Sequence, residues 1–264
     1  MDIDRKSHFL CDSITLSYPN SFGNSLTRGT AVTQMRSYVR VNAIEMTACA
    51  APSVNTTPTR VRARLVNTFF NTGNRVTLKT TAAFGAAGNP VLLDNGGIEA
   101  DSEAQGPVLI GVAYPMTIGP GGAFFGANGQ SLVIGTLLAG NVPIGVHGGG
   151  EGFEVRFAHP ANTFTGNLAV GSNTFGDAVL GIVADGSLGH AANVITLGYN
   201  FFDGESTQTG SGTLRAFADI SFPASRTLRL DGDDDDGGGV FDTNGFNLTV
   251  AAPLTELHAG TPLT

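Results

Sequence analysis

Short segments in which apolar and polar residues alternate recur along the chain, and they restrict its fold more than any other feature. Residues 153–157 (FEVRF), 227–230 (TLRL) and 246–250 (FNLTV) are examples. Alternation turns one set of side chains inward and the other towards solvent, as in a β-strand. Gly, Asn, Asp and Pro separate these segments, and no window of about 12 residues keeps a helical stripe. The pattern predicts an all-β chain of short strands.

Composition excludes the other common classes. Of the 264 residues, 41% are hydrophobic and 17 are Phe, so the chain can fill a core and is not a disordered tail. The 37 glycines show no every-third-residue pattern, which excludes collagen. Lys, Glu, Leu and Ala do not dominate the sequence, as they do in a coiled coil.

Two long stretches, 66–140 and 161–260, share four short blocks in the same order. The blocks pair 67–69 with 162–164, 84–89 with 188–193, 116–118 with 228–230, and 125–134 with 241–250. Repeats of short strands predict a solenoid, best a parallel β-helix in which neighbouring coils supply each other's hydrogen bonds. We expect it over 61–264, with about nine coils of roughly 22 residues and a length of ~43 Å, after an irregular segment 1–60.

Three of these segments also resemble a known repeat. Residues 161–166 (ANTFTG), 185–197 (DGSLGHAANVITL) and 241–248 (FDTNGFNL) are similar to the autotransporter-associated β-strand repeat. The resemblance is clearest over 150–264, weaker over 66–140, and absent from 1–60. It implies a right-handed parallel β-helix belonging to the passenger region of a bacterial surface or secreted protein.

Charge is divided unevenly. Residues 1–79 hold ten Lys and Arg against four Asp and Glu, whereas 80–264 hold four against eighteen. An acidic body argues against a nucleic-acid partner, because phosphate binding needs a cationic face.

The sequence contains no run of about 18 apolar residues, so it predicts no membrane-spanning helix. The first 30 residues lack the apolar core of a signal peptide, so we expect an extracellular or outer-membrane location only as part of a longer exported chain.

The most conspicuous polar motif is an acidic loop at 231–239 (DGDDDDGGG). Carboxylates are the oxygen ligands that calcium prefers, but the spacing fits neither an EF-hand nor a calcium roll. The other interpretation is a solvated turn, four residues longer than its counterpart at 119–122. No other cofactor is expected, and the candidate calcium ligands are Asp231, Asp233, Asp234, Asp235 and Asp236.

Other metal and redox signals are weak. Cys11 and Cys49 either form one disulfide or stay reduced, and no Cys/His spacing indicates zinc. No two histidines lie within four residues of each other, so we expect each to be a surface or turn residue: His8, His147, His159, His190 and His258.

No catalytic motif stands out, so we expect a structural or adhesive surface rod and not an enzyme. Its partners would be a host-surface or matrix carbohydrate or protein, and a second copy through the exposed edge of the last coil. The alternative is a polysaccharide lyase or hydrolase that uses Arg and Asp on adjacent coils, with Arg226, Arg229, Asp231 and Asp242 as candidates. A groove lined by Asp and Arg would favour the enzyme, and a smooth face of Thr, Asn and Ser would favour the rod.

Overall fold

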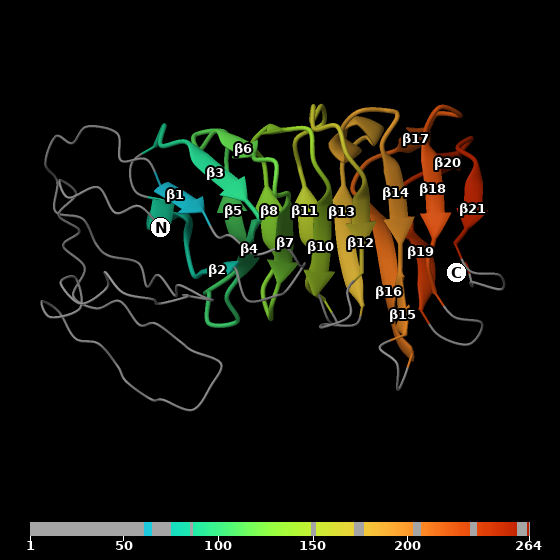
Figure 1. Cartoon of the computed structure of the whole chain (residues 1–264), viewed down its shortest axis with the longest axis horizontal. Coiled ribbons are helices and arrows are strands. Elements are labelled where there is room, and N and C mark those ends of the chain that lie inside the picture. Colours follow the sequence, from blue (N-terminus) through green and yellow to red (C-terminus); the bar gives the residue numbers. More distant parts are fainter. Residues whose placement is uncertain are drawn as a thin grey trace, which may run out of the picture.

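The computed structural model shows a parallel β-solenoid of about six turns (Figure 1). It describes residues 61–64, 75–84, 87–148, 152–171, 177–202, 207–232, 237–257 and 263. The predicted irregular segment 1–60, with Cys11 and Cys49, lies outside these ranges. The predicted all-β, parallel β-helical fold is confirmed.

Each coil passes through three faces in a constant order, and strands on one face stack in parallel. The first sheet contains β1 (Val61–Arg64), β3 (Val91–Asp94), β6 (Met116–Ile118) and β9 (Leu138–Ala139). The second contains β2 (Arg75–Leu78), β4 (Gly96–Ala100), β7 (Ala123–Ala127), β10 (Ile144–Gly148), β12 (Leu168–Val170), β14 (Val194–Leu197), β18 (Thr227–Leu230) and β21 (Leu254–Glu256). The third contains β5 (Val108–Ile110), β8 (Leu132–Ile134), β11 (Val155–Phe157), β13 (Ala178–Ile182), β16 (Thr207–Ala216) and β19 (Gly238–Asp242).

Most of the remaining elements follow the same winding. β17 (Ile220–Phe222) and β20 (Leu248–Val250) take the place of the first sheet in the last coils. Two short 3-10 helices, η1 (Thr81–Phe84) and η2 (Asp185–Leu188), stand where a strand would otherwise be. β15 (Tyr199–Phe202) departs from the parallel pattern, because it pairs antiparallel with β16.

The coils are longer and fewer than the sequence predicts. In the second sheet, Val146 pairs with Phe125, 21 positions earlier, and Leu230 pairs with Leu197, 33 positions earlier. The strands stay short while the corners vary, and the longest of these coils contains the β15–β16 pair. A single spacing of about 22 residues therefore overestimates the number of coils.

The long repeats match segments that lie on different faces. Residues 116–118 form β6 of the first sheet, whereas 228–230 belong to β18 of the second. Residues 125–134 run from the second sheet to the third, whereas 241–250 run from the third to β20. In these two pairs, the second block therefore lies one face further along the coil than the first. What the paired blocks share is a strand followed by a corner, and this unit occurs on all three faces.

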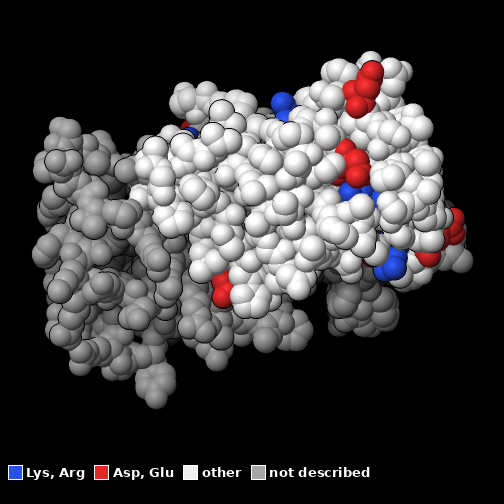
Figure 2. Space-filling view, turned by 90° about the horizontal axis from the view of Figure 1, so that it is seen from above, with Lys and Arg blue, Asp and Glu red and all other residues white. Residues whose placement is uncertain are grey.

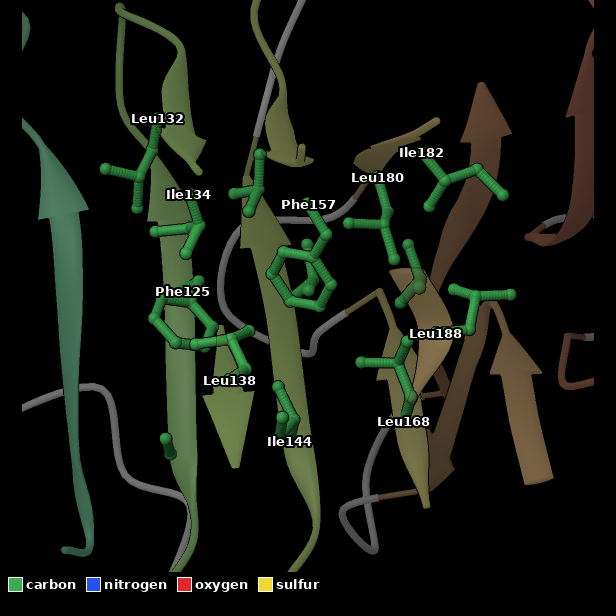
Figure 3. Close-up of a cluster of buried hydrophobic side chains, with 14 of the residues drawn as sticks. Phe125, Leu132, Ile134, Leu138, Ile144, Phe157, Leu168, Leu180, Ile182 and Leu188 are labelled. Carbon is green, nitrogen blue, oxygen red and sulfur yellow. The ribbon is translucent and has the colours of Figure 1, made fainter. Parts of the chain in front are cut away.

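Alternate side chains point inward and form one continuous core (Figure 3). The rings of Phe125 and Phe157 meet edge to face with their centroids 5.6 Å apart, and the centroids of Phe157 and Phe164 are 6.5 Å apart. The predicted alternation is confirmed in β11 and β18, whose inward residues are buried. It fails in β20, where Leu248 is half-buried and Val250 exposed, because among the described strands β20 pairs with β17 alone.

Buried asparagines join coils at a corner that lacks a strand. The Oδ1 atom of Asn162 accepts a hydrogen bond from the Leu138 amide at 2.9 Å, and its Nδ2 donates to the Ser187 carbonyl at 2.8 Å. Asn193 similarly accepts from the Gly166 amide at 2.9 Å and donates to the Phe164 carbonyl at 3.0 Å. Buried backbone groups need such partners, so these side chains replace ladder hydrogen bonds.

Replacing Asn162 by Ala should lower the free energy of unfolding by about 3 kcal/mol, because two buried backbone groups lose their partner. Asn167 is exposed just before β12, so Asn167→Ala is the matched control and should change the free energy of unfolding by less than about 0.5 kcal/mol. Urea unfolding measures both. Equal effects would show that Asn162 does not join the coils.

Candidate functional site

A row of charged side chains crosses neighbouring coils on the outer face of the third sheet. Arg156 on β11 lies beside Gly181 on β13, Gly181 beside Arg215 on β16, and Arg215 beside Asp242 on β19. Their strand neighbours, among them Val155 and Leu214, are buried in the core. Alternation therefore turns the row outward. Together with Glu154, which comes just before β11, we call Arg156, Arg215 and Asp242 the charge row.

Glu154 lies at the centre of the charge row and is only 5% exposed. Its Oε1 accepts a hydrogen bond from Nε of Arg156 at 2.8 Å, and its Oε2 accepts one from Nη1 of Arg215 at 3.2 Å. Nε of Arg215 donates to Oδ2 of Asp242 at 2.6 Å. Two cations and two anions therefore alternate, and the formal charge of the row is zero.

A glycine makes room for this packing. A Cβ atom on Gly181 would lie 2.7 Å from the Phe217 ring and 3.2 Å from Cγ of Arg156. The Arg156 guanidinium carbon is 3.4 Å from the centroid of the Phe217 ring, a cation–π contact. Any larger residue at position 181 would push the aromatic ring off the sheet.

The contacts keep the Arg215–Asp242 pair ionised. The hydrogen bond from Arg215 lowers the pKa of Asp242 below its ordinary value of 3.8, against the opposing effect of partial burial. Burial acts to lower the pKa of Arg215, but the bonds to Asp242 and Glu154 outweigh it and raise that pKa. Asp242 and Arg215 are therefore charged at neutral pH.

The charge row is a balanced arrangement. Each arginine donates to a carboxylate of this chain, and each carboxylate receives at least one such bond. A lyase site needs a cation that can neutralise an acidic group of the substrate, and here that charge is already compensated. What the row offers a ligand is a partly exposed set of planar hydrogen-bonding groups beside an aromatic ring.

The four residues expected in an enzyme lie in three places. Arg226 is fully buried: its guanidinium donates to the Asp185 carboxylate and to the carbonyls of Gly189 and His190. It holds the η2 corner to the following coil and does not face solvent. Arg229 is an outward-facing residue of β18 in the second sheet, Asp231 follows the end of that strand, and Asp242 pairs with Arg215 on the third sheet.

The acidic loop begins at Asp231, just after β18. Gly232 and Gly237 form an antiparallel bridge, and Asp233, Asp234, Asp235 and Asp236 lie outside the described residues. Within the described ranges, no three His, Cys, Asp or Glu side chains gather in a way that could hold a metal ion. Calcium binding by this loop stays a prediction.

The histidine prediction is wrong for His147. This residue is buried on β10, with its ring 5.2 Å from that of Phe124. It lies opposite Gly126, where a Cβ atom would come within 2.5 Å of the imidazole, so the small residue leaves space for the ring. His8 and His258 lie outside the described residues.

His159 and His190 do lie in turns, and they reveal a motif that the sequence analysis missed. Residues 159–162 and 190–193 share the pattern His-x-Ala-Asn. In both, the histidine Nδ1 accepts a hydrogen bond at 3.2 Å from the amide two residues later, and the asparagine is buried. The repeated spacing was a signal that could have located both corner asparagines.

Figure 2 shows the molecule from above, relative to its orientation in Figure 1. The described part of this face is mostly uncharged, and its few charged side chains lie mainly towards the C-terminal half. Within the described part of the chain, the structure contains no helix with the length and hydrophobicity needed to cross a membrane.

Comparison of the chain with protein-family models, curated proteins and solved structures finds no match. The solenoid is therefore established by the structure, and the relation to autotransporter passengers stays a prediction.

Replacing Asp242 by Asn should lower the free energy of unfolding at neutral pH by about 1 kcal/mol or less, because the pair is partly solvated. The carboxylate has a lowered pKa in the folded state, so its contribution exists above its unfolded pKa and is lost as pH falls through the lowered value. The difference between wild type and Asp242→Asn should therefore vanish on acidification. Urea midpoints across that pH range measure it.

Glu103 provides the control, because its pKa is also lowered, by an ion pair with Lys79, but at a fully exposed position. Glu103→Gln should change the midpoint less than Asp242→Asn at neutral pH. A difference for Asp242→Asn that persists in acid would contradict the role of its charge.

Calcium should leave the thermal midpoint unchanged if the acidic loop is a solvated turn. A variant with Asn at 233–236 should then respond to millimolar calcium exactly as wild type does, in differential scanning calorimetry. A midpoint that calcium raises in wild type but not in the variant would establish a calcium site, since a ligand stabilises only the state that binds it.

Proposed function

We propose that this chain is a structural or adhesive solenoid that extends and presents its outer corners, and that it performs no catalysis. The observation that supports this is where its polar side chains bond. Asn162, Asn193 and Arg226 bond to neighbouring coils, and the arginines of the charge row bond to carboxylates of the same chain. These groups stabilise the rod instead of converging on a reaction centre.

The corners are the variable part of the rod. Coils of 21 and 33 residues keep the same strand register in the second sheet, so added residues are accommodated outside the core. Surface segments that vary without disturbing the scaffold are a common basis for recognition.

The balanced charge row suits a partner that is recognised by hydrogen bonds. We propose a host-surface or matrix carbohydrate or protein, bound outside the cell by an exported form of the chain. Arg156 and Phe217 add a planar guanidinium and an aromatic ring, which pack well against flat ligand surfaces.

A polysaccharide lyase or hydrolase is the second candidate, because the charge row does bring Arg and Asp together on adjacent coils. Its arginines are already paired, which is why we favour the binding role. The two candidates differ in whether Arg215 is needed for turnover.

The decisive experiment incubates the purified chain with neutral and acidic polysaccharides and measures new reducing ends and unsaturated sugars. We expect none, from wild type or from Arg215→Gln. Lys79→Gln, which removes a partly exposed cation on an early coil, is the matched control, and circular dichroism checks that each variant is folded. Turnover that Arg215→Gln abolishes and Lys79→Gln retains would overturn the proposal in favour of the enzyme.

A further inference from the structure

The chain contains three Asn-Gly pairs, at 95–96, 128–129 and 244–245. Such a pair can modify itself, because glycine has no side chain to block the approach of its nitrogen to the asparagine amide. The glycine nitrogen forms a bond to Cγ of the asparagine and ammonia leaves, which closes a five-membered imide. Water then opens the imide at either carbonyl and yields aspartate or isoaspartate. One water is consumed and one ammonia is released, so no other reactant is needed.

The fold restrains the pair at 244–245. Asn244 and Gly245 both have positive φ, 48° and 84°, in a turn closed by a hydrogen bond from the Phe246 amide to the Thr243 carbonyl at 2.8 Å. The Asn244 side chain also donates to the Ala216 carbonyl at 3.2 Å. Reaction at Asn244 therefore requires these bonds to open first.

The pair at 95–96 is restrained in a different way. Asn95 has a φ of 57°, and its amide donates to the Gly122 carbonyl at 2.9 Å. Gly96 is buried as the first residue of β4, so the nitrogen that would attack belongs to a strand of the second sheet. Reaction at Asn95 requires that strand to separate from its neighbours.

Asn128 has none of these restraints. It is exposed just after β7, it does not share the positive φ of the other two, and among the hydrogen bonds of the described residues none involves its side chain. Gly129 has a φ of 72°, and a Cβ atom there would lie 2.7 Å from Cβ of Ser102, so this position requires glycine. The corner therefore fixes the reactive glycine and leaves the asparagine side chain free.

We infer that Asn128 is a site of spontaneous conversion to aspartate or isoaspartate, and that the product weakens the stacking of the early coils. Ala127 pairs with Ala100, so Asn128 comes next to Asp101 of the preceding coil. Asp101 is nearly buried, and its Oδ1 accepts a hydrogen bond from the Glu103 amide at 2.8 Å. A new carboxylate at position 128 would lie beside that of Asp101, and like charges on neighbouring strands are destabilising. Isoaspartate also lengthens the main chain at this corner.

Peptide mapping by mass spectrometry of the purified full chain, kept at mildly alkaline pH, tests the site. We expect the mass gain of an amide-to-acid change to develop at Asn128 at least about tenfold faster than at Asn95 or Asn244, because those two must first open locally. A chain kept in denaturant is the control, and there all three should convert at similar rates. Equal or faster conversion at Asn95 or Asn244 in the folded chain, no conversion at Asn128, or the same ranking in denaturant would each overturn the inference.

The consequence is tested with Asn128→Asp, which has the charge of the product. Lys79, a cation at this corner, is already paired with Glu103, so the added charge should lower the urea midpoint, and the loss should shrink at high salt. Asn128→Gln retains the amide, and Asn167→Asp adds the same charge just before β12; both should keep the wild-type midpoint. An unchanged midpoint in Asn128→Asp, or an equal loss in Asn167→Asp, would overturn the proposed weakening. The inference requires only the solenoid, so it can fail or stand separately from the polysaccharide assay.

Discussion

Hydrogen bonding between successive coils is the interaction on which this fold depends. Each strand leaves half of its backbone groups unpaired until the next coil stacks on it, and buried groups without partners are costly. Where a corner interrupts the ladder, Asn162 and Asn193 supply the missing partners through their side chains. Arg226 does the same around η2, where it bonds to three carbonyls and a carboxylate. These three buried polar residues are thus part of the backbone pairing between coils.

The charge row extends the same principle to the outer face. Glu154 is nearly buried, and it is stabilised because arginines from two different strands donate to it. Because Gly181 has no side chain, the intervening strand β13 passes beneath this contact without obstruction. The row therefore links β11, β16 and β19 through side chains in addition to the ladder. This bonding supports the structural role that we propose for the chain.

The fold could be predicted from period-two alternation, because inward and outward positions follow directly from strand geometry. The coil number could not, since corners of different length separate equally short strands. The partners of the charged residues could not be predicted either. Arg226 bonds to Asp185, 41 positions away, and Arg215 bonds to Asp242, 27 positions away. Which residues meet across coils depends on the length of every intervening corner. A repeated short motif such as His-x-Ala-Asn carries that information only after the corners are known.

The β15–β16 pair shows how independent one coil is from the next. It departs from the parallel winding, yet Leu230 after it still pairs in register with Leu197 before it. The scaffold accommodates an antiparallel pair at one corner while the second sheet keeps its parallel register. Evolution or protein design could therefore replace the segment at this corner, by single substitutions or as a whole, while the rest of the solenoid stays the same.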